Sequence, residues 1–311
     1  MARMIPKLRK KLRRQLFFDV GDYRKTVFLA GTGRSGTTWV EEIINRRNDF
    51  RIMFEPFHST KVDILHDWNY RQYLRDDDRR DQFLIPASRI LNGRIKNDWI
   101  DKENHKIFSR KRLIKDIRAQ LILHWIKHNF PEIPIVMLLR HPCAVANSKL
   151  KLGWDTRLDE FLRQDELMQD FLNPFKKDLE NAETLFDKHI FLWCVENYIP
   201  LKQFKEGEIL VIFYEDLCKH PQNEVERIMP FIGESYSPEI LDQVTKPSAQ
   251  SRKHSAIINQ TDLINSWRKS ISDELVKRSV EILSLFGLQK IYNNGDMPLM
   301  NGAEALKTFS T

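Results

Sequence analysis

Short apolar runs alternate with longer stretches of helical periodicity along most of the chain. The apolar runs predict five strands, at Thr26–Ala30, Arg51–Phe54, Arg112–Lys115, Ile133–Leu139 and Glu208–Phe213. The last two are continuous rather than alternating, which is typical of parallel strands buried on both faces. Helical periodicity predicts helices at Gly36–Arg47, Arg118–Asn129, Pro142–Leu150, Asn181–Phe204, Asn223–Ile232 and Ser272–Phe286.

This alternation predicts an α/β fold of three layers, with a central parallel sheet of about five strands flanked by helices. Between Lys61 and Ile107 the pattern weakens into mixed charge and scattered aromatic residues. We expect a helical excursion there, on the face where the strands end and where such folds bind ligands. Because no Pro/Gly/Ser-rich linker divides the chain, we expect a basic N-terminal arm at residues 1–20 and a single domain at 21–311.

The composition fits a globular enzyme better than a disordered, secreted or membrane-spanning chain. Of 311 residues, 41% are hydrophobic and 30% charged, so a large core is available. No uncharged stretch approaches the ~18 residues of a membrane span, and the start lacks the cleavage site of a secretory signal. Three widely spaced cysteines form neither a disulfide framework nor a zinc pattern. These features favour a cytoplasmic protein.

The net charge of +7 is concentrated at the start of the chain. Seven of the 50 Lys and Arg residues lie among the first 14 positions, and the remainder balances the 43 acidic residues. Such an arm can attract anionic surfaces. The rest of the chain shows no basic–aromatic interleaving and no zinc-finger spacing, so we expect no nucleic-acid partner.

A glycine-rich turn, Gly-Thr-Gly-Arg-Ser-Gly-Thr-Thr-Trp from Gly31 to Trp39, links the first predicted strand to a helix. Glycines let backbone N–H groups approach an anion, and the helix N-terminus adds its positive end. A dinucleotide site would need an acidic residue after the second strand, whereas Asp49 precedes that strand. A nucleotide triphosphatase loop would need lysine after Gly36, where this chain has Thr37. A simple helix cap also remains open.

The run Arg-Ser-Gly-Thr-Thr-Trp resembles the 5′-phosphosulfate loop of sulfotransferases that use 3′-phosphoadenosine-5′-phosphosulfate (PAPS). The resemblance implies that Arg34 supplies a cation to the bridging and sulfonate oxygens. It also implies that the rest of the run contributes to cofactor binding, namely Ser35, Gly36, Thr37, Thr38 and Trp39.

Three later segments match this family in order, so the resemblance extends from Thr26 to about Tyr292. Arg140-His141-Pro142 with Ser148 resembles the motif that binds the 3′-phosphate. Tyr214, followed by Glu215-Asp216, resembles the residue beside the adenine, and we expect the two acids to be structural. Arg252 or Lys253 would supply a second 3′-phosphate cation, and Ser266-Trp267-Arg268-Lys269 resembles the element that closes over the nucleotide.

The phenol and steroid branch of the family uses a histidine base in a Lys-Thr-His run, but here Lys115 is followed two positions later by Ile117. Instead, Phe54-Glu55-Pro56-Phe57-His58 resembles the Glu-Pro segment of carbohydrate-type and many bacterial members. We therefore expect Glu55 to be the general base, with Lys115 and Arg34 stabilising the bridging oxygen. His58 is the alternative base, and Glu55 acting only as an ion-pair partner of Lys115 or Arg118 also stays open.

The resemblance implies a PAPS-dependent sulfotransferase that releases 3′,5′-adenosine bisphosphate (PAP). Its acceptor would be a hydroxyl, less readily an amine, of a small polar metabolite or glycan. We expect no metal, since His124 and His128 lack the glutamate of a metalloprotease helix. A P-loop kinase and a nucleotide-binding module without turnover are the alternatives. No pattern specifies the acceptor or the oligomeric state.

Overall fold

Five strands form a central sheet in which every neighbouring pair is parallel. They are β2 (Thr26–Gly31), β3 (Arg51–Phe54), β5 (Arg112–Asp116), β6 (Ile135–Leu139) and β7 (Leu210–Phe213), in the order β3-β5-β2-β6-β7. The computed structural model describes residues 17–244 and 263–310. The predicted α/β class is confirmed, and all five predicted strands are present. β6 and β7 begin slightly later than predicted, at Ile135 and Leu210.

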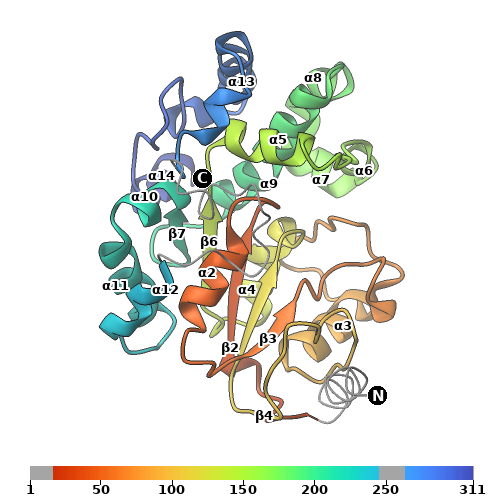
Figure 1. The fold of residues 1–311 in the computed structure, drawn as a ribbon. Coiled ribbons are helices and arrows are strands. Elements are labelled where there is room, and N and C mark those ends of the chain that lie inside the picture. The colour runs from red at the N-terminus through yellow and green to blue at the C-terminus, as the bar shows by residue number, and fades with distance from the viewer. Residues whose placement is uncertain (1–16, 245–262, 311) are drawn as a thin grey trace, which may run out of the picture.

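Helices cover both faces of the sheet (Figure 1). Side chains alternate along β2, so Val27 and Leu29 pack into one core while Phe28 and Ala30 pack into the other. This double burial explains why β2, β6 and β7 are almost wholly apolar. The helices are α2 (Thr37–Ile44), α3 (Asp81–Leu91), α4 (Leu123–Asn129), α5 (Pro142–Leu150), α6 (Asp159–Leu162), α7 (Asp165–Leu167), α8 (Lys176–Glu180), α9 (Leu185–Gln203), α10 (Tyr214–Lys219), α11 (Pro221–Phe231), α12 (Leu241–Val244), α13 (Asp273–Leu285) and α14 (Gly302–Phe309).

The six predicted helices correspond to α2, α4, α5, α9, α11 and α13. The bounds of α5 are as predicted, because Pro142 suits the first turn and the His141 side chain accepts a hydrogen bond from the Cys143 N–H. Within residues 17–244 and 263–310, no helix is both long and apolar enough to cross a bilayer.

The excursion at Lys61–Ile107 differs from the expectation. Its regular structure is limited to α3 and a short 3₁₀ turn at Asp63–Leu65. It also reaches both ends of the sheet. The Gly93 and Ile95 carbonyls accept hydrogen bonds from Arg51, the first residue of β3, and Trp99 Nε1 donates to the Glu55 carbonyl just after β3. Only part of this segment therefore lies at the carboxyl ends of the strands.

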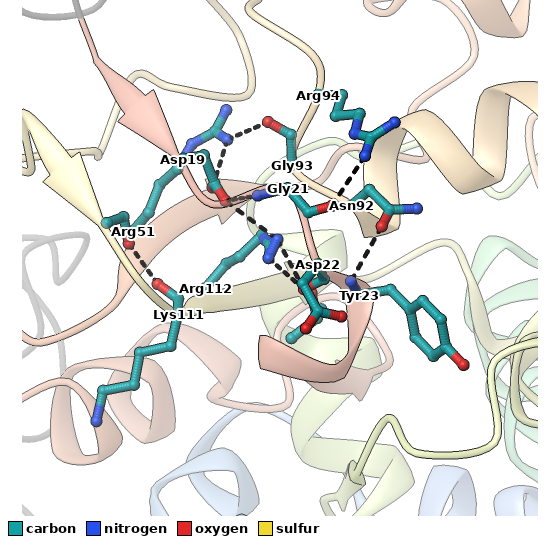
Figure 2. A network of polar contacts seen from close by, with 12 residues as sticks. Asp19, Gly21, Asp22, Tyr23, Arg51, Asn92, Gly93, Arg94, Lys111 and Arg112 are labelled. Atoms are coloured by element: carbon teal, nitrogen blue, oxygen red, sulfur yellow. Dashed lines mark hydrogen bonds and ion pairs between the residues drawn. The ribbon is translucent and has the colours of Figure 1, made fainter.

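A buried ionic network fixes the amino ends of β3 and β5 (Figure 2). The Asp19 carboxylate lies 3.0 Å from Arg51 Nη1 and 3.2 Å from Arg112 Nη1, and both arginines are fully buried. Arg51 also pairs with Asp101 at 2.9 Å. Asp19 belongs to β1 (Phe18–Asp19), which pairs in parallel with β4 (Phe108–Ser109). Asp19, which the sequence places in the N-terminal arm, is thus tied to the central sheet by its ion pairs.

Candidate active site

The glycine-rich turn joins β2 to α2 at the carboxyl edge of the sheet. Gly36 caps α2 with φ 105°, and a Cβ there would lie 2.7 Å from a ring atom of Tyr214. Both the left-handed backbone and the close ring require glycine at this position. The turn therefore holds its shape through a residue that the sequence motif already marked.

Two predicted site residues have a strained backbone. Among the described residues, four that are not glycine have positive φ, and these include Arg34 (77°) and Glu55 (44°). Such conformations cost of order 1–3 kcal/mol and concentrate at functional sites. The strain supports a functional role for both residues.

Arg34 is linked to the two residues predicted to bind the 3′-phosphate. Its Nε donates a hydrogen bond to Ser148 Oγ at 2.9 Å, and its carbonyl accepts one from Arg140 Nη1 at 3.3 Å. Arg140 follows β6, the neighbour of β2. The structure thus brings together three residues that lie far apart in the sequence.

Lys115 contacts the same turn from the other side. It lies in β5, and its buried ammonium donates to Thr38 Oγ1 at 3.0 Å. It also pairs with Glu41 at 3.3 Å and with Glu103 at 3.7 Å. Burial raises the pKa of the Glu41 carboxyl to about 7, although Lys115 opposes this shift. Sequence reasoning missed Glu41, one turn after Thr38 on α2.

Two buried aromatic residues, Trp39 of the turn and Tyr214 after β7, pack beneath the glycine-rich turn. Trp39 and Tyr214 are buried, with ring centroids 5.4 Å apart, and the Arg140 guanidinium lies 4.0 Å from the Tyr214 ring. Tyr214 also packs against Gly36. The tyrosine therefore supports the turn and orients Arg140.

Three buried donors in this region have no partner among the residues that the structure describes. They are Ser35 Oγ, Trp39 Nε1 and Arg140 Nε. A buried polar group without a partner costs about 1–3 kcal/mol, which a ligand can recover. Together with the cations Arg34, Arg140 and Lys115, this donor set fits an anionic cofactor with phosphate and sulfonate groups.

Glu55 lies at the end of β3, where the sequence predicts the general base. Its N–H donates to the Lys115 carbonyl at 2.7 Å, and its carboxylate Oε2 accepts a hydrogen bond from Arg118 Nη1 at 2.5 Å. The pairing with Arg118 that the sequence left open is present, so Arg118 fixes the position of this buried carboxylate.

Asp116, the last residue of β5, supports this arrangement. Its carboxylate accepts the Phe57 and Arg118 N–H groups, each at 2.8 Å. Burial, and then the Glu55 charge, raise the pKa of Asp116 to about 7. Asp116 thus ties the segments after β3 and β5 together.

His58, the alternative base, is buried between the rings of Tyr70 and Trp99, each with its centroid 5.2 Å away. Burial, followed by the positive charge of Arg118, lowers the pKa of His58 to about 3. The imidazole is therefore neutral near pH 7 and holds a proton only weakly.

Helix α9 contacts the Arg140 segment and the glycine-rich turn through two residues that the sequence analysis did not identify. Trp193 Nε1 donates to the Arg140 carbonyl at 3.0 Å, and Asn197 Nδ2 donates to Thr32 Oγ1 at 3.2 Å. Trp193 and Asn197 are four positions apart and so share one helix face. This four-residue spacing of two polar-tipped side chains was the sequence feature that could have indicated their shared role.

The C-terminal elements are described in part. Arg252 and Lys253 lie outside the described residues. Trp267 stacks on His141, with ring centroids 4.5 Å apart, and the Leu263 carbonyl accepts a bond from Arg140 Nη2 at 3.4 Å. The segment from Leu263 onward thus returns to the 3′-phosphate motif.

Glu215 has structural partners. Its carboxylate accepts the His141 N–H at 2.9 Å and the Tyr292 hydroxyl at 2.7 Å. Burial raises the pKa of Glu215, while these hydrogen bonds lower it. The contacts support the structural role expected for this acid.

Comparison with known proteins identifies the family. The sulfotransferase domain matches residues 24–281. Carbohydrate sulfotransferase 1 of Danio rerio is 19% identical over 94% of this chain and 83% of its own length. Sulfotransferase 1B1 of Canis lupus familiaris is 22% identical over 76% of this chain and 69% of its own. Mouse sulfotransferase SULT7A1, crystallised with PAP, has a TM-score of 0.41 at 11% identity, covering 96% of this chain and 93% of its own.

The family match covers most of the chain, so this protein belongs to the sulfotransferase family. It is a transferase that moves a sulfonate group to a hydroxyl acceptor. The kinase and the inactive nucleotide-binding module are not favoured.

Proposed function

We propose that the turn after β2 binds PAPS as the sulfonate donor. The observation that carries this proposal is the convergence of Arg34, Lys115 and Arg140 on one glycine-rich turn, from three adjacent strand ends. In the order β3-β5-β2-β6-β7, the chain leaves β2 toward one edge of the sheet and, after crossing from β5 to β6, continues toward the other edge. The ends of these strands therefore lie at the point where the strand order reverses, which is where α/β folds bind ligands. Two cations near the 5′ end and one near the 3′ end match a donor that is anionic at both positions.

When bound, PAPS supplies a sulfonate attached to a phosphate leaving group. Arg34 and Lys115 stabilise negative charge that develops on the bridging oxygen. Ser35, Gly36, Thr37 and Thr38 orient the anion through hydroxyl and backbone N–H donors at the start of α2. Arg140 and Ser148 bind the 3′-phosphate, and Arg252 or Lys253 adds a second cation there.

Glu55 accepts the proton of the acceptor hydroxyl. Its carboxylate is held by Arg118, and its left-handed backbone aims the side chain from the end of β3. His58 is less suited, because a pKa of about 3 makes its imidazole a weaker proton acceptor than an ordinary carboxylate. His58 instead lines the acceptor side of the site.

The acceptor is a small polar metabolite or a glycan. The Glu-Pro segment and the similarity to Carbohydrate sulfotransferase 1 of Danio rerio support a polar acceptor rather than a phenol or steroid. We place the reaction in the cytoplasm, which suits the buried free thiols of Cys143 and Cys194.

The test is release of PAP from PAPS in the presence of a panel of hydroxyl acceptors. Arg34→Ala should lower turnover by roughly 10²–10³, the effect of losing one preorganised donor. Arg47→Ala, an exposed arginine just after α2, is the matched control and should retain activity. Unchanged turnover in Arg34→Ala would remove this residue from the mechanism, and magnesium-dependent ATP binding in place of PAP binding would favour a kinase.

A second pair of variants decides the base. Glu55→Gln should abolish turnover while keeping PAP affinity, because only the proton acceptor is lost. The exposed Glu226→Gln serves as its control. If Glu55→Gln remains active and His58→Ala does not, the base is His58.

A further inference from the structure

Lys149 in α5 is the most unusual buried charge of the described residues. Its side chain is 1% exposed, and within residues 17–244 and 263–310 its Nζ has no hydrogen-bond partner. Burial lowers the pKa of this ammonium to about 8, so it remains mostly charged at neutral pH. A buried, unpaired ammonium is costly for folding alone.

Two further buried arginines carry unused donors, and their charges act on Lys149. Arg71 Nη1 and Arg118 Nε are buried without a hydrogen-bond partner in the part of the chain that the structure describes. The charges of Arg71 and Arg118 both contribute to the lowered pKa of Lys149, while Glu196 opposes it. Arg71 and Arg118 lie beside the same ring, that of Tyr70, and together with Lys149 they are here called the basic cluster.

Three acidic groups lie beside the three cations of the basic cluster, and one of them is only partly ionised near pH 7. Glu196 Oε1 accepts a hydrogen bond from Arg71 Nε at 2.6 Å, and Glu55 pairs with Arg118. Asp116 is neutral for part of the population near pH 7, and its oxygens accept backbone N–H groups. The cluster thus keeps a small excess of positive charge near pH 7, with three unpaired donors and one unpaired acceptor, Glu196 Oε2, among the described residues.

The basic cluster adjoins the proposed point of transfer through Arg118, which binds the carboxylate of the proposed base, Glu55. Lys149 lies on α5, the helix that also carries Ser148, the partner of Arg34 in the nucleotide turn.

A further arginine extends the positive charge outward. The Tyr70 ring lies 5.1 Å from the Arg71 guanidinium, 4.9 Å from that of Arg118 and 4.4 Å from that of Arg157. Arg157 has positive φ, the third such residue at this site after Arg34 and Glu55. Arg71, Arg118 and Arg157 thus surround one ring, and the half-exposed Arg157 also pairs with Glu160 at 3.2 Å.

We propose that the basic cluster of Arg71, Arg118 and Lys149 binds an oxyanion of the acceptor, a carboxylate or a sulfate ester, beside the hydroxyl that is sulfonated. This inference rests on the proposed function and specifies its substrate class as anionic hydroxyl compounds. Two guanidiniums and one ammonium supply charge-assisted donors for such a group. The sulfonate of the donor has the same chemistry, so the experiment must separate the two sources.

The first arm measures anion binding without turnover. The nucleotide site is filled with PAP, and thermal unfolding is followed with sodium sulfate against sodium chloride at equal ionic strength. At ten times the dissociation constant, sulfate should raise Tm by about 2 °C in a protein of this size. Lys149→Met should lose this shift, and Lys151→Met should keep it. Lys151 is exposed and donates to Ser270 Oγ, which makes it a matched control.

The second arm measures donor affinity. Lys149→Met should bind PAP and PAPS with the same ratio of affinities as the wild type, because the cluster holds the acceptor. A selective loss of PAPS affinity would assign the cluster to the donor sulfonate and overturn the proposal. If Lys149→Met does not fold, Lys149→Gln takes its place in all arms.

The third arm measures turnover on pairs of hydroxyl acceptors that differ only as carboxylate and carboxamide. The wild type should prefer the carboxylate by at least tenfold in kcat/KM, through KM, and Lys149→Met should lose this preference. An equal sulfate shift in wild type and Lys149→Met, or no carboxylate preference, refutes the inference. Absence of all PAPS turnover refutes the proposed function instead, since the sulfate arm does not depend on catalysis.

Discussion

Replacing Lys115 by methionine separates a catalytic role from a structural one. The Lys115 ammonium lies 3.0 Å from Thr38 Oγ1 in the nucleotide turn and 3.3 Å from Glu41 Oε2. Methionine keeps the length and the apolar stem but removes the charge. The variant therefore withdraws a cation from the turn and leaves the Glu41 carboxyl buried without it.

The cost to stability follows from the charges. Two unit charges at 3.3 Å attract each other by about 5 kcal/mol at an effective dielectric constant of ~20. Protonation of Glu41 limits the loss, because its pKa is already about 7. Neutralising such a carboxyl at pH 8 costs only about 1.4 kcal/mol. We therefore expect Lys115→Met to lower the free energy of unfolding by about 1–2 kcal/mol at pH 8.

The effect of the substitution on stability should depend on pH. The pKa of Glu41 rises from its ordinary 4.5 to about 7 in the folded state, so protonated Glu41 favours the folded state at low pH. The wild type loses this part of its free energy of unfolding as the pH rises from about 4.5 to about 7. Without Lys115 the pKa of Glu41 rises further, and the loss continues above pH 7. At pH 6 the carboxyl is mostly neutral in both proteins, and the difference between them should be small.

The double variant Lys115→Met/Glu41→Gln distinguishes the two roles. It removes the buried carboxylate, so urea unfolding at pH 8 should show most of the lost stability restored. Turnover, measured as PAP release, should stay lower by roughly 10²–10³, because the cation at the bridging oxygen is still missing. Lys111→Met, which breaks a partly exposed pair with Glu234, is the control from the other end of β5.

Two results would refute this reasoning. If the double variant regains turnover, Lys115 acts only by neutralising Glu41. If Lys115→Met is equally destabilised at pH 6 and pH 8, Glu41 is not the group that titrates.

Three further variants test other parts of the structure. Arg140→Ala should weaken PAP binding by about 1.5–3 kcal/mol while leaving adenosine 5′-phosphosulfate, which lacks the 3′-phosphate, unaffected in calorimetry. Gly36→Ala should lower the free energy of unfolding by about 2–4 kcal/mol in urea titrations, because φ is 105° and the Cβ would lie 2.7 Å from the Tyr214 ring. Asp19→Ala should cost about 3–5 kcal/mol, since it leaves the buried Arg51 short of a carboxylate, yet the folded protein should keep its kcat. Equal loss of both nucleotides, a neutral Gly36→Ala, or lost kcat in folded Asp19→Ala would contradict the respective assignments.

The sequence predicted the parts of the fold that depend on local pattern. Continuous apolar runs identified β2, β6 and β7, because parallel strands are buried on both faces. The strand–turn–helix motif located Arg34, and the resemblance to a family motif named Arg140 and Ser148, each of which contacts Arg34 in the structure. Each of these features can be recognised from residues that are close together in the sequence.

Contacts between distant segments were not predictable in this way. The pairing of Arg71 with Glu196 joins residues 125 positions apart, and neither has a local signal. Arg51 and Arg112 look like ordinary strand-start cations, and the two-residue strand that carries Asp19 is too short for periodicity. The roles of Glu55, His58 and the other site residues stay predictions, because side-chain proximity alone does not assign a chemical step.

Helix α9 has a consequence for how the two substrates affect each other's binding. Within two turns it carries Trp193, bonded to the Arg140 carbonyl, Asn197, bonded to Thr32, and Glu196, bonded to Arg71. One helix thus contacts both the nucleotide turn and the proposed acceptor side. A ligand that restrains α9 from one side leaves it less conformational entropy to lose when the second ligand binds, so the two substrates should bind with positive cooperativity even where they do not touch.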